Sequence, residues 1–198
     1  MSDAVQEVPF GTVVEGKRVG AFVAVTAWAP IYADYDDPTM TAEYRASLFP
    51  MVLMIHRWDG AIGFVGGFLD EGNTIEEQAR KEGLEEIGVT FDDRLAPLVS
   101  HETKWMTVHL YHYDICRDLG GITPTAAMRI VAGSAARAQH SVAEGNAFWA
   151  HLADYGRGKG WRRLRDSNVL SDAVGEELDA VRAWMYANAP EGAYKGTA

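Results

Sequence analysis

Three glutamates of one predicted helix are spaced so that their carboxylates meet on one side of it. Glu82 lies three residues before Glu85 and four before Glu86, and residues at these spacings are neighbours on a helix surface. Like charges so placed weaken an isolated helix by roughly 0.2–0.5 kcal/mol per pair, and a divalent cation would relieve the repulsion. Mg²⁺ takes carboxylate oxygens and commonly shares its shell with substrate phosphates. The spacing is typical either of a Mg²⁺ or Mn²⁺ site or of a solvated acidic helix face.

A glycine pair, Gly66-Gly67, stands before this helix and suits the same chemistry. Glycine lets backbone N–H groups approach phosphate oxygens closely. A metal held by the glutamates would neutralise charge developing on a pyrophosphate and make a bound water more acidic. If the acids bind metal, these residues together predict hydrolysis of a phosphoanhydride bond.

The segment from Gly67 to Val89 resembles the Nudix box. In that motif a glycine is followed after five residues by a glutamate, and after seven more by Arg-Glu-hydrophobic-x-Glu-Glu-x-Gly-hydrophobic. Here the last part reads Lys81-Glu82-Gly83-Leu84-Glu85-Glu86-Ile87-Gly88-Val89, at the family's distance from Gly67. The resemblance implies an α/β fold, a Nudix-type α/β/α sandwich with a mixed sheet.

The same resemblance implies a role for each acidic residue. The family's metal-binding core corresponds to Glu82, Glu85 and Glu86, which would hold Mg²⁺ or Mn²⁺. One of these, or Glu144 on the loop before the last strand, would position or deprotonate the attacking water. Lys81 would orient the carboxylates, as an arginine does in the family.

Three positions depart from the family pattern. Asn73 replaces the first glutamate, so one outer carboxylate is missing. Lys81 keeps the charge of the arginine but loses its bidentate fork. Gly83 replaces a hydrophobic residue and weakens the helix by up to about 1 kcal/mol relative to alanine, which a tight helix–sheet contact would explain. We expect altered efficiency or a subfamily, and the alternative is a non-catalytic nucleotide-binding module.

Residues 52–70 resemble more narrowly the branch that contains the small-nucleolar-RNA decapping enzymes and inosine-diphosphate phosphatases. That resemblance implies a nucleoside diphosphate, or one linked to another moiety such as a capped RNA end, as substrate. ADP-ribose or a dinucleoside polyphosphate is the alternative. A histidine that stacks on the purine in that branch is replaced here by Ala24 or Val25, so the resemblance does not extend to inosine preference.

Other residues are candidates for binding or proton transfer, each with a structural alternative. Four aromatic residues would stack on a base or fill the core: Phe22, Trp28, Trp105 and Trp149. Arg57 would hold a terminal phosphate or lie at the surface. His140 and His101 are further proton-transfer candidates. A basic cluster would receive RNA or polyphosphate, or balance the C-terminal acids: Arg157, Lys159, Arg162, Arg163 and Arg165.

The composition of the 198 residues indicates one globular domain over 1–198, with 47% hydrophobic and 23% charged residues. The net charge of -10 disfavours broad nucleic-acid binding. No apolar run approaches a membrane span, the N-terminus lacks the pattern of a secretory signal, and Cys116 is the single cysteine. We expect a cytoplasmic protein without membrane contact, with a nucleotide derivative as partner and an RNA 5′ end or a second copy of the chain as further candidates.

Residue patterns predict the order strand, hairpin, helix, hairpin, helix, strand, helix. The strands are predicted at 19–28, 49–58, 61–64, 98–101, 105–116 and 146–152. The helices are predicted at 74–87, 124–139 and 171–188. Thr74 with Glu77 forms a capping box, and Gly88 suits a C-terminal cap. Residues 1–17 are predicted to be loose, with a short strand at 12–14, and residues 29–44 to form a long loop.

Overall fold

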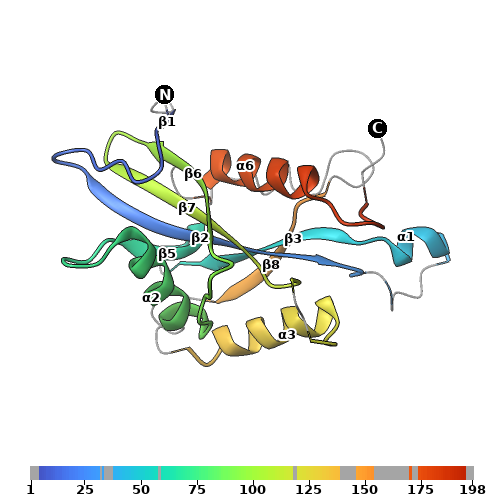
Figure 1. Cartoon of the computed structure of the whole chain (residues 1–198). Helices are drawn as coiled ribbons and strands as arrows, with labels where there is room; N and C mark the ends of the chain where they lie inside the picture. The colour runs from blue at the N-terminus through green and yellow to red at the C-terminus, as the bar shows by residue number, and fades with distance from the viewer. Residues whose placement is uncertain are drawn as a thin grey trace.

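The computed structural model describes residues 5–31, 33, 38–57, 59–117, 120–138, 146–153, 170 and 174–194. Its strands are β1 (Gln6–Glu7), β2 (Arg18–Ala29), β3 (Phe49–His56), β4 (Ile62–Gly63), β5 (Val65–Phe68), β6 (Ala96–Glu102), β7 (Met106–Asp114) and β8 (Ala147–His151). Its helices are α1 (Ala42–Ala46), α2 (Ile75–Ile87), α3 (Pro124–Ala135) and α6 (Val174–Ala187). Figure 1 shows one sheet with helices on both faces, which confirms the predicted α/β/α sandwich.

Strand β2 lies at the centre of the sheet and positions the site. Along one edge it pairs in parallel with β7 over residues 18–26. Along the other edge it pairs antiparallel with β5 over residues 20–23 and with β3 over residues 26–29. The main path of the sheet is β1-β6-β7-β2-β3-β4, and β8 pairs with β3. The sheet is therefore mixed, as predicted, and β3 and β5 share one edge of the same long strand.

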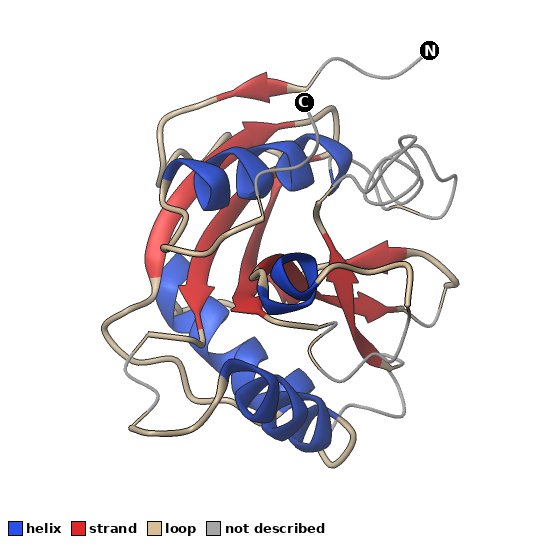
Figure 2. Cartoon of the chain, turned by 90° about the vertical axis from the view of Figure 1, so that its right-hand side faces the viewer, coloured by secondary structure: helices blue, strands red, loops and turns tan. Residues whose placement is uncertain are grey.

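Two hydrophobic cores explain why the β2 sequence is apolar almost throughout. Val23 and Val25 point into the core formed with α2 and α3, whereas Ala24 and Trp28 point into the core formed with α6. Successive side chains of a strand face opposite sides of the sheet, so a strand covered on both faces has no polar side. Figure 2 shows α6 on one side of the sheet and the other long helices on the opposite side.

Helix α2 begins and ends where the sequence predicts. The Thr74 hydroxyl accepts from the Glu77 N–H, and the Glu77 carboxylate accepts from the Thr74 N–H at 2.7 Å. Gly88 ends the helix with a φ of 65°, and its N–H donates to the carbonyls of Gly83 and Leu84. A glycine adopts this left-handed conformation without the steric cost that other residues meet. These two caps fix the position of the acidic side chains along the helix.

Some local predictions were wrong. No strand forms at residues 12–14; the N-terminal strand is β1, which pairs with β6. Residues 42–46 form the short helix α1, capped by Thr41, within what was predicted as loop. Phe10 packs on Tyr111 with ring centroids 4.9 Å apart, so this part of the first 17 residues contacts the sheet.

In the described part of the chain, no helix combines the length and apolarity needed to span a membrane.

Candidate active site

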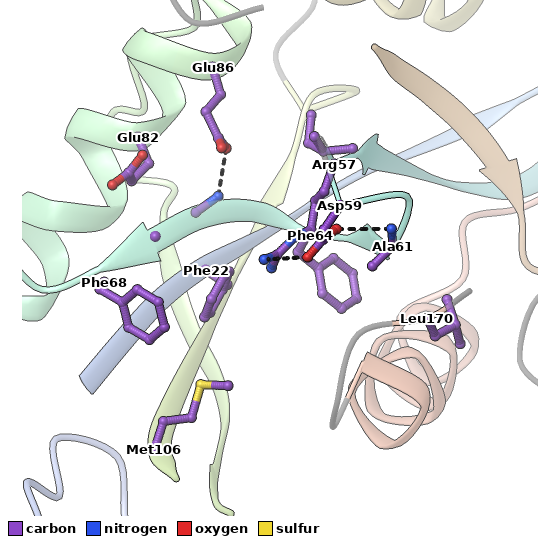
Figure 3. Close-up of a pocket in the computed structure, with 13 residues that line it drawn as sticks. Phe22, Arg57, Asp59, Ala61, Phe64, Phe68, Glu82, Glu86, Met106 and Leu170 are labelled. Atoms are coloured by element: carbon purple, nitrogen blue, oxygen red, sulfur yellow. Dashed lines mark hydrogen bonds and ion pairs between the residues drawn. The ribbon is translucent and has the colours of Figure 1, made fainter. Parts of the chain in front are cut away.

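A cavity of about 560 Å³ opens beside the middle of β2, within the range typical of small-molecule sites. It is lined by residues from β2, β3, β5, α2 and β7 and from the turn after β3: Phe22, Ile55, Arg57, Asp59, Ala61, Phe64, Gly66, Gly67, Phe68, Glu82, Glu86, Met106 and Leu170. Figure 3 shows Glu82 and Glu86 on one side of β5 and the aromatic side chains on the other. The cavity thus has an acidic end and an aromatic end.

At the acidic end of the cavity, α2 contacts the glycine pair Gly66-Gly67, which lies within strand β5 and not in a turn as predicted. The N–H of Gly66 donates to Glu86 Oε2 at 2.8 Å, and Glu86 is 7% exposed (Figure 3). That N–H, predicted to face a pyrophosphate, thus holds a carboxylate in place. Glu82 accepts a hydrogen bond of 2.7 Å from the Gln78 side chain. Both acids therefore have fixed orientations along one wall of the cavity.

Both glycines of β5 stand at close approaches, to the backbone of β2 at Gly66 and to the end of the Glu82 side chain at Gly67. Gly66 has a φ of +146°, and a Cβ there would lie 2.3 Å from the backbone oxygen of Ala21. At Gly67 a Cβ would lie 2.4 Å from Glu82 Oε1. Real side-chain carbons do not make such contacts, so β5 approaches β2 and α2 this closely because these positions lack side chains.

Gln78 organises the loop in front of the acids. It is 1% exposed, and its Oε1 accepts from the Asp70 N–H at 3.1 Å and from Asn73 Nδ2 at 2.9 Å. Its Nε2 then donates to Glu82. Asn73, which stands where the family has a glutamate, is therefore part of a hydrogen-bonded chain that reaches an acid in the cavity wall.

Lys81 sits between two acidic partners. Its Nζ lies 2.5 Å from Asp70 Oδ2 and 3.9 Å from Glu85 Oε2. The hydrogen bond to Asp70 raises the pKa of the lysine, and the same bond lowers the pKa of the Asp70 carboxyl. Glu85 is half-buried but does not line the cavity. Lys81 is thus fixed mainly by Asp70, a partner that the sequence analysis did not identify.

The chemistry of the donors fits a hard divalent cation at the acidic end. Burial raises the pKa of the Glu82 carboxyl above its usual value, with the hydrogen bond from Gln78 opposing that shift. Desolvation thus disfavours the charged carboxylate, and a cation beside it would offset this cost. Within the described residues, no three His, Cys, Asp or Glu side chains are gathered closely enough to enclose an ion. Glu82 and Glu86 therefore offer a partial shell, which substrate oxygens and water would complete.

The aromatic end is formed by Phe22, Phe64 and Phe68 together with Met106. Arg57 lies there too, and its Nη2 donates to Asp59 Oδ2 at 3.2 Å (Figure 3). The Arg18 guanidinium lies 3.2 Å from the ring centroid of Phe68 and covers it. Apolar walls with few polar groups are typical of a surface that receives a nucleotide base.

Of the four aromatic candidates, Phe22 lines the cavity and the others do not. Trp28 contacts Tyr186 in the α6 core, and Trp149 donates its ring N–H to the Met128 carbonyl at 3.1 Å. Trp105 is 64% exposed. His101 is buried on β6 away from the cavity lining. Some predicted residues lie outside the described part of the chain: His140, Glu144, Arg157, Lys159, Arg162, Arg163 and Arg165.

Several residues of the site were missed from the sequence, although some carry a signal. Gln78 stands four residues before Glu82, which is the spacing of a helical hydrogen bond. Phe68 ends the short strand that carries the glycine pair, and Phe64 lies directly before that strand. Leu170 and Met106 have no sequence feature that links them to the acids, because the cavity brings them there only through tertiary structure.

Known proteins resemble this chain both in sequence, over part of its length, and in fold. A family model described as Nudt16-like, U8 snoRNA-decapping enzyme-like, matches residues 25–118. This range includes both the glycine pair of β5 and the acidic helix α2. A search of curated proteins finds no match to the sequence.

Solved structures share the fold at low sequence identity. A mutT/nudix family protein from Listeria innocua has a TM-score of 0.55 and 13% identity, covering 86% of this chain and 95% of that chain. A mutant of the Bacillus subtilis pyrophosphohydrolase BsRppH has a TM-score of 0.53 and 12% identity, covering 97% and 98%. The NUDIX domain of Shewanella oneidensis NrtR, complexed with ADP ribose, has a TM-score of 0.50 and 14% identity, covering 87% and 90%. At these identities the likeness shows the fold alone.

Proposed function

We propose that the chain is a Nudix hydrolase, which the match of residues 25–118 to a Nudt16-like family model supports, and that it hydrolyses a phosphoanhydride bond with the help of Mg²⁺ or Mn²⁺. The substrate would be a nucleoside diphosphate, or a nucleoside diphosphate joined to another moiety such as a capped RNA end. The observation that carries this proposal is the placement of Glu82 and Glu86 on one wall of a cavity whose other end is aromatic.

The two ends of the cavity suit the two parts of a nucleotide. Glu82 and Glu86, with Glu85 beside them on the helix, would supply carboxylate oxygens to the cation near the phosphates. When bound, such a cation makes a water molecule more acidic and neutralises charge on the pyrophosphate. Phe22 would face the base at the aromatic end, where stacking contributes about 1–3 kcal/mol.

The surrounding residues keep the acids in position. The Gly66 N–H would orient Glu86, and Gln78 would orient Glu82, through the hydrogen bonds described above. Lys81 would balance the charge of the acidic cluster from the side of Asp70 and Glu85. Arg57 lies at the cavity wall with a guanidinium that can donate to a phosphate or to a base. Glu144 stays a proposed proton acceptor for the attacking water.

Two alternatives lead to different products. ADP-ribose or a dinucleoside polyphosphate would be cut between phosphates that each remain attached to a nucleoside or sugar, so nucleotide and no inorganic phosphate is released. The ADP ribose bound by the structurally similar NrtR domain is the reason to include this class. A non-catalytic module would bind nucleotide without cutting it.

A substrate panel separates these functions. The full chain would be assayed with adenosine, guanosine and inosine diphosphates, ADP-ribose, diadenosine polyphosphates and a capped RNA, each with Mg²⁺, Mn²⁺ or EDTA. Phosphate and nucleotide release would be measured separately. We expect metal-dependent product release from a nucleoside diphosphate or from the capped RNA. Nucleotide binding without metal-dependent product from any of these substrates would overturn the proposed function in favour of the binding module.

A further inference from the structure

Trp105 lies between β6 and β7, and 64% of its surface is exposed. The ammonium group of Lys104 lies 4.6 Å from the centroid of its ring. A single exposed aromatic side chain is common on protein surfaces and by itself indicates no function. The residues around Trp105 therefore decide whether the ring is a binding surface.

The backbone places Trp105 directly beside the aromatic end of the cavity. The Arg18 N–H donates to the Trp105 carbonyl at 3.4 Å, and Arg18 pairs in register with Met106. Met106 lines the cavity, and so does Phe68, whose ring the Arg18 guanidinium covers. Figure 3 shows Phe68 and Met106 on the side of β5 that faces away from the acids. Arg18 and Trp105 thus continue this end of the cavity outward onto the surface.

Positive charge accompanies the exposed ring. Arg18 and Lys104 are exposed, and the nearby carboxylate of Glu102 is bound by Lys17 at 2.6 Å. These four residues carry an excess of positive charge in a chain whose net charge is -10. An aromatic ring receives a base by stacking, and cations beside it attract the phosphates. Single-stranded nucleic acid offers both groups, so it complements this rim of the cavity.

The orientation of a nucleotide in the cavity determines which part of a substrate reaches Trp105. Under the proposed function the phosphates lie with Glu82 and Glu86, and the base lies with Phe22. A chain attached at the ribose 3′ oxygen leaves the nucleotide on the side away from its 5′ phosphates, toward Trp105. The second nucleoside of a dinucleoside polyphosphate is attached through the phosphates instead, so it would lie beyond the acids. A free nucleoside diphosphate has no part that extends to this ring.

On the basis of the proposed function, we propose that Trp105, Lys104 and Arg18 bind the second nucleotide of a single-stranded RNA whose 5′-terminal nucleotide occupies the cavity. The second base stacks on Trp105. Lys104 and Arg18 donate to the phosphates that follow the first ribose, since a guanidinium that stacks by its face keeps its N–H donors at its edge. The preferred substrate is therefore an RNA 5′ end rather than a free nucleoside diphosphate.

The test measures binding separately from catalysis. Calorimetry with Mg²⁺ would give dissociation constants for 5′-monophosphorylated RNAs of one, two and six nucleotides, which are products and are not turned over. We expect the second nucleotide to tighten binding to the wild type about 10-fold, the effect of one stacked base. Trp105→Ala should remove this gain, and Trp105→Phe should keep most of it. The matched control is Ile130→Ala, which truncates another exposed apolar residue, on α3, and should behave as the wild type.

The cations are tested by the salt dependence of affinity for the six-nucleotide RNA. Loss of one phosphate contact lowers the slope of log affinity against log salt concentration by about 0.7 for a single strand. We expect this decrease in Lys104→Gln and no decrease in Arg129→Gln, which removes an exposed cation from α3. Equal slopes in the wild type and Lys104→Gln would remove Lys104 from the proposed surface.

Several outcomes would overturn the proposal. The wild type could bind one and two nucleotides equally, or Trp105→Ala could keep the gain. An equal loss for one and two nucleotides would indicate a change in the cavity itself. Weaker binding of diadenosine tetraphosphate alone would assign the ring to a second nucleoside beyond the phosphates. A dimer in sedimentation that Trp105→Ala dissociates, with unchanged RNA affinity, would assign the ring to contact between copies.

The same measurements separate this proposal from the proposed function. A length-dependent gain in RNA affinity that requires Trp105, in a protein that hydrolyses no substrate of the panel, would refute the proposed function and sustain the RNA surface. Metal-dependent hydrolysis of nucleoside diphosphates without any gain from the second nucleotide would do the reverse.

Discussion

The backbone N–H of Gly66 donates a hydrogen bond of 2.8 Å to Glu86, so the glycine pair of strand β5 holds the acid that helix α2 presents to the cavity. The next glycine, Gly67, faces the acid one turn earlier, with no room for a Cβ beside Glu82. Two successive strand residues, Gly66 and Gly67, thus contact acids on two successive turns of the helix.

Alanine at Gly67 should lower the activity and leave the stability almost unchanged, whereas alanine at Gly66 should lower the stability. Gly67→Ala would place a Cβ 2.4 Å from Glu82 Oε1, the end of a flexible side chain, so Glu82 would move and the fold would be kept. We expect turnover to fall about 10- to 100-fold, the effect of a displacement of about 1 Å in a catalytic group, with little change in melting temperature.

Gly66→Ala is the matched comparison. Its Cβ would meet a backbone oxygen, and its φ of +146° disfavours any side chain. We expect a loss of more than about 1 kcal/mol of unfolding free energy, measured by denaturant titration. Full turnover in Gly67→Ala would show that the position of Glu82 is not important for the reaction.

Gly83→Ala should destabilise the protein, against the rule for a helix interior. Alanine in place of glycine ordinarily stabilises a helix by up to about 1 kcal/mol. Here the added Cβ would collide with the ring of Phe91, which follows the helix and is buried. The tight contact is therefore with this loop residue. The expected tight contact between the helix and the sheet at this position was wrong.

The size and origin of this effect can be measured in a double-mutant cycle. We expect Gly83→Ala to cost about 1–3 kcal/mol in the wild type, as overpacking does, and less in a Phe91→Leu background. Additive effects in the cycle, or a gain of stability in the single variant, would contradict the contact.

Gln78→Leu should weaken both the fold and the site. The substitution leaves the Asp70 N–H without its partner and removes the hydrogen bond to Glu82. Asp70 is an exposed residue, and a typical intramolecular hydrogen bond contributes about 0.5–1.5 kcal/mol to stability, so we expect a loss of this size in urea unfolding. The apparent metal affinity in turnover assays should also decrease, because Glu82 loses its orientation. A variant with wild-type stability and metal dependence would show that the Gln78 network has no role.

His112 should make stability depend on pH. It is 4% exposed, its Nε2 lies 2.7 Å from the Thr26 hydroxyl, and its ring stacks on Trp184. Burial lowers the pKa of His112 from 6.5 to about 4. Between these values the unfolded chain binds this proton and the folded protein does not, so stability falls as pH decreases.

The contribution of His112 is isolated by comparing the wild type with His112→Gln. Over the range from pH 7 to pH 4 the wild type should lose up to about 3 kcal/mol more than the variant, since one pKa unit is about 1.4 kcal/mol. Unfolding free energies from urea titrations at several pH values give the two slopes. Parallel slopes would mean that His112 titrates alike in the folded and unfolded states.

The local structure of the acidic helix was predictable because its signals are local. Thr74, Glu77 and Gly88 mark its ends, and the spacing of Glu82 and Glu86 places both on one face. Hydrophobic periodicity also predicted the positions of the long strands and of α6. The boundaries shifted by a few residues, because tertiary pairing decides where a strand stops.

The aromatic end of the cavity was only partly predictable. Phe22 was one of four equivalent aromatic candidates, and only the register of β2 against β5 shows that it faces the site. Trp105 was another of the four, and the sequence alone did not show that its ring stays exposed beside the cavity rather than within it.

The most direct test of the account is the metal-stimulated turnover of Glu86→Gln on the best substrate of the panel. The matched control is Glu76→Gln, which changes an acid on the same helix that is exposed and paired with Arg80 outside the cavity. We predict that Glu86→Gln lowers turnover by orders of magnitude at an unchanged melting temperature, while Glu76→Gln stays close to the wild type. Near-normal turnover in a folded Glu86→Gln protein would contradict the proposed role of the acidic helix.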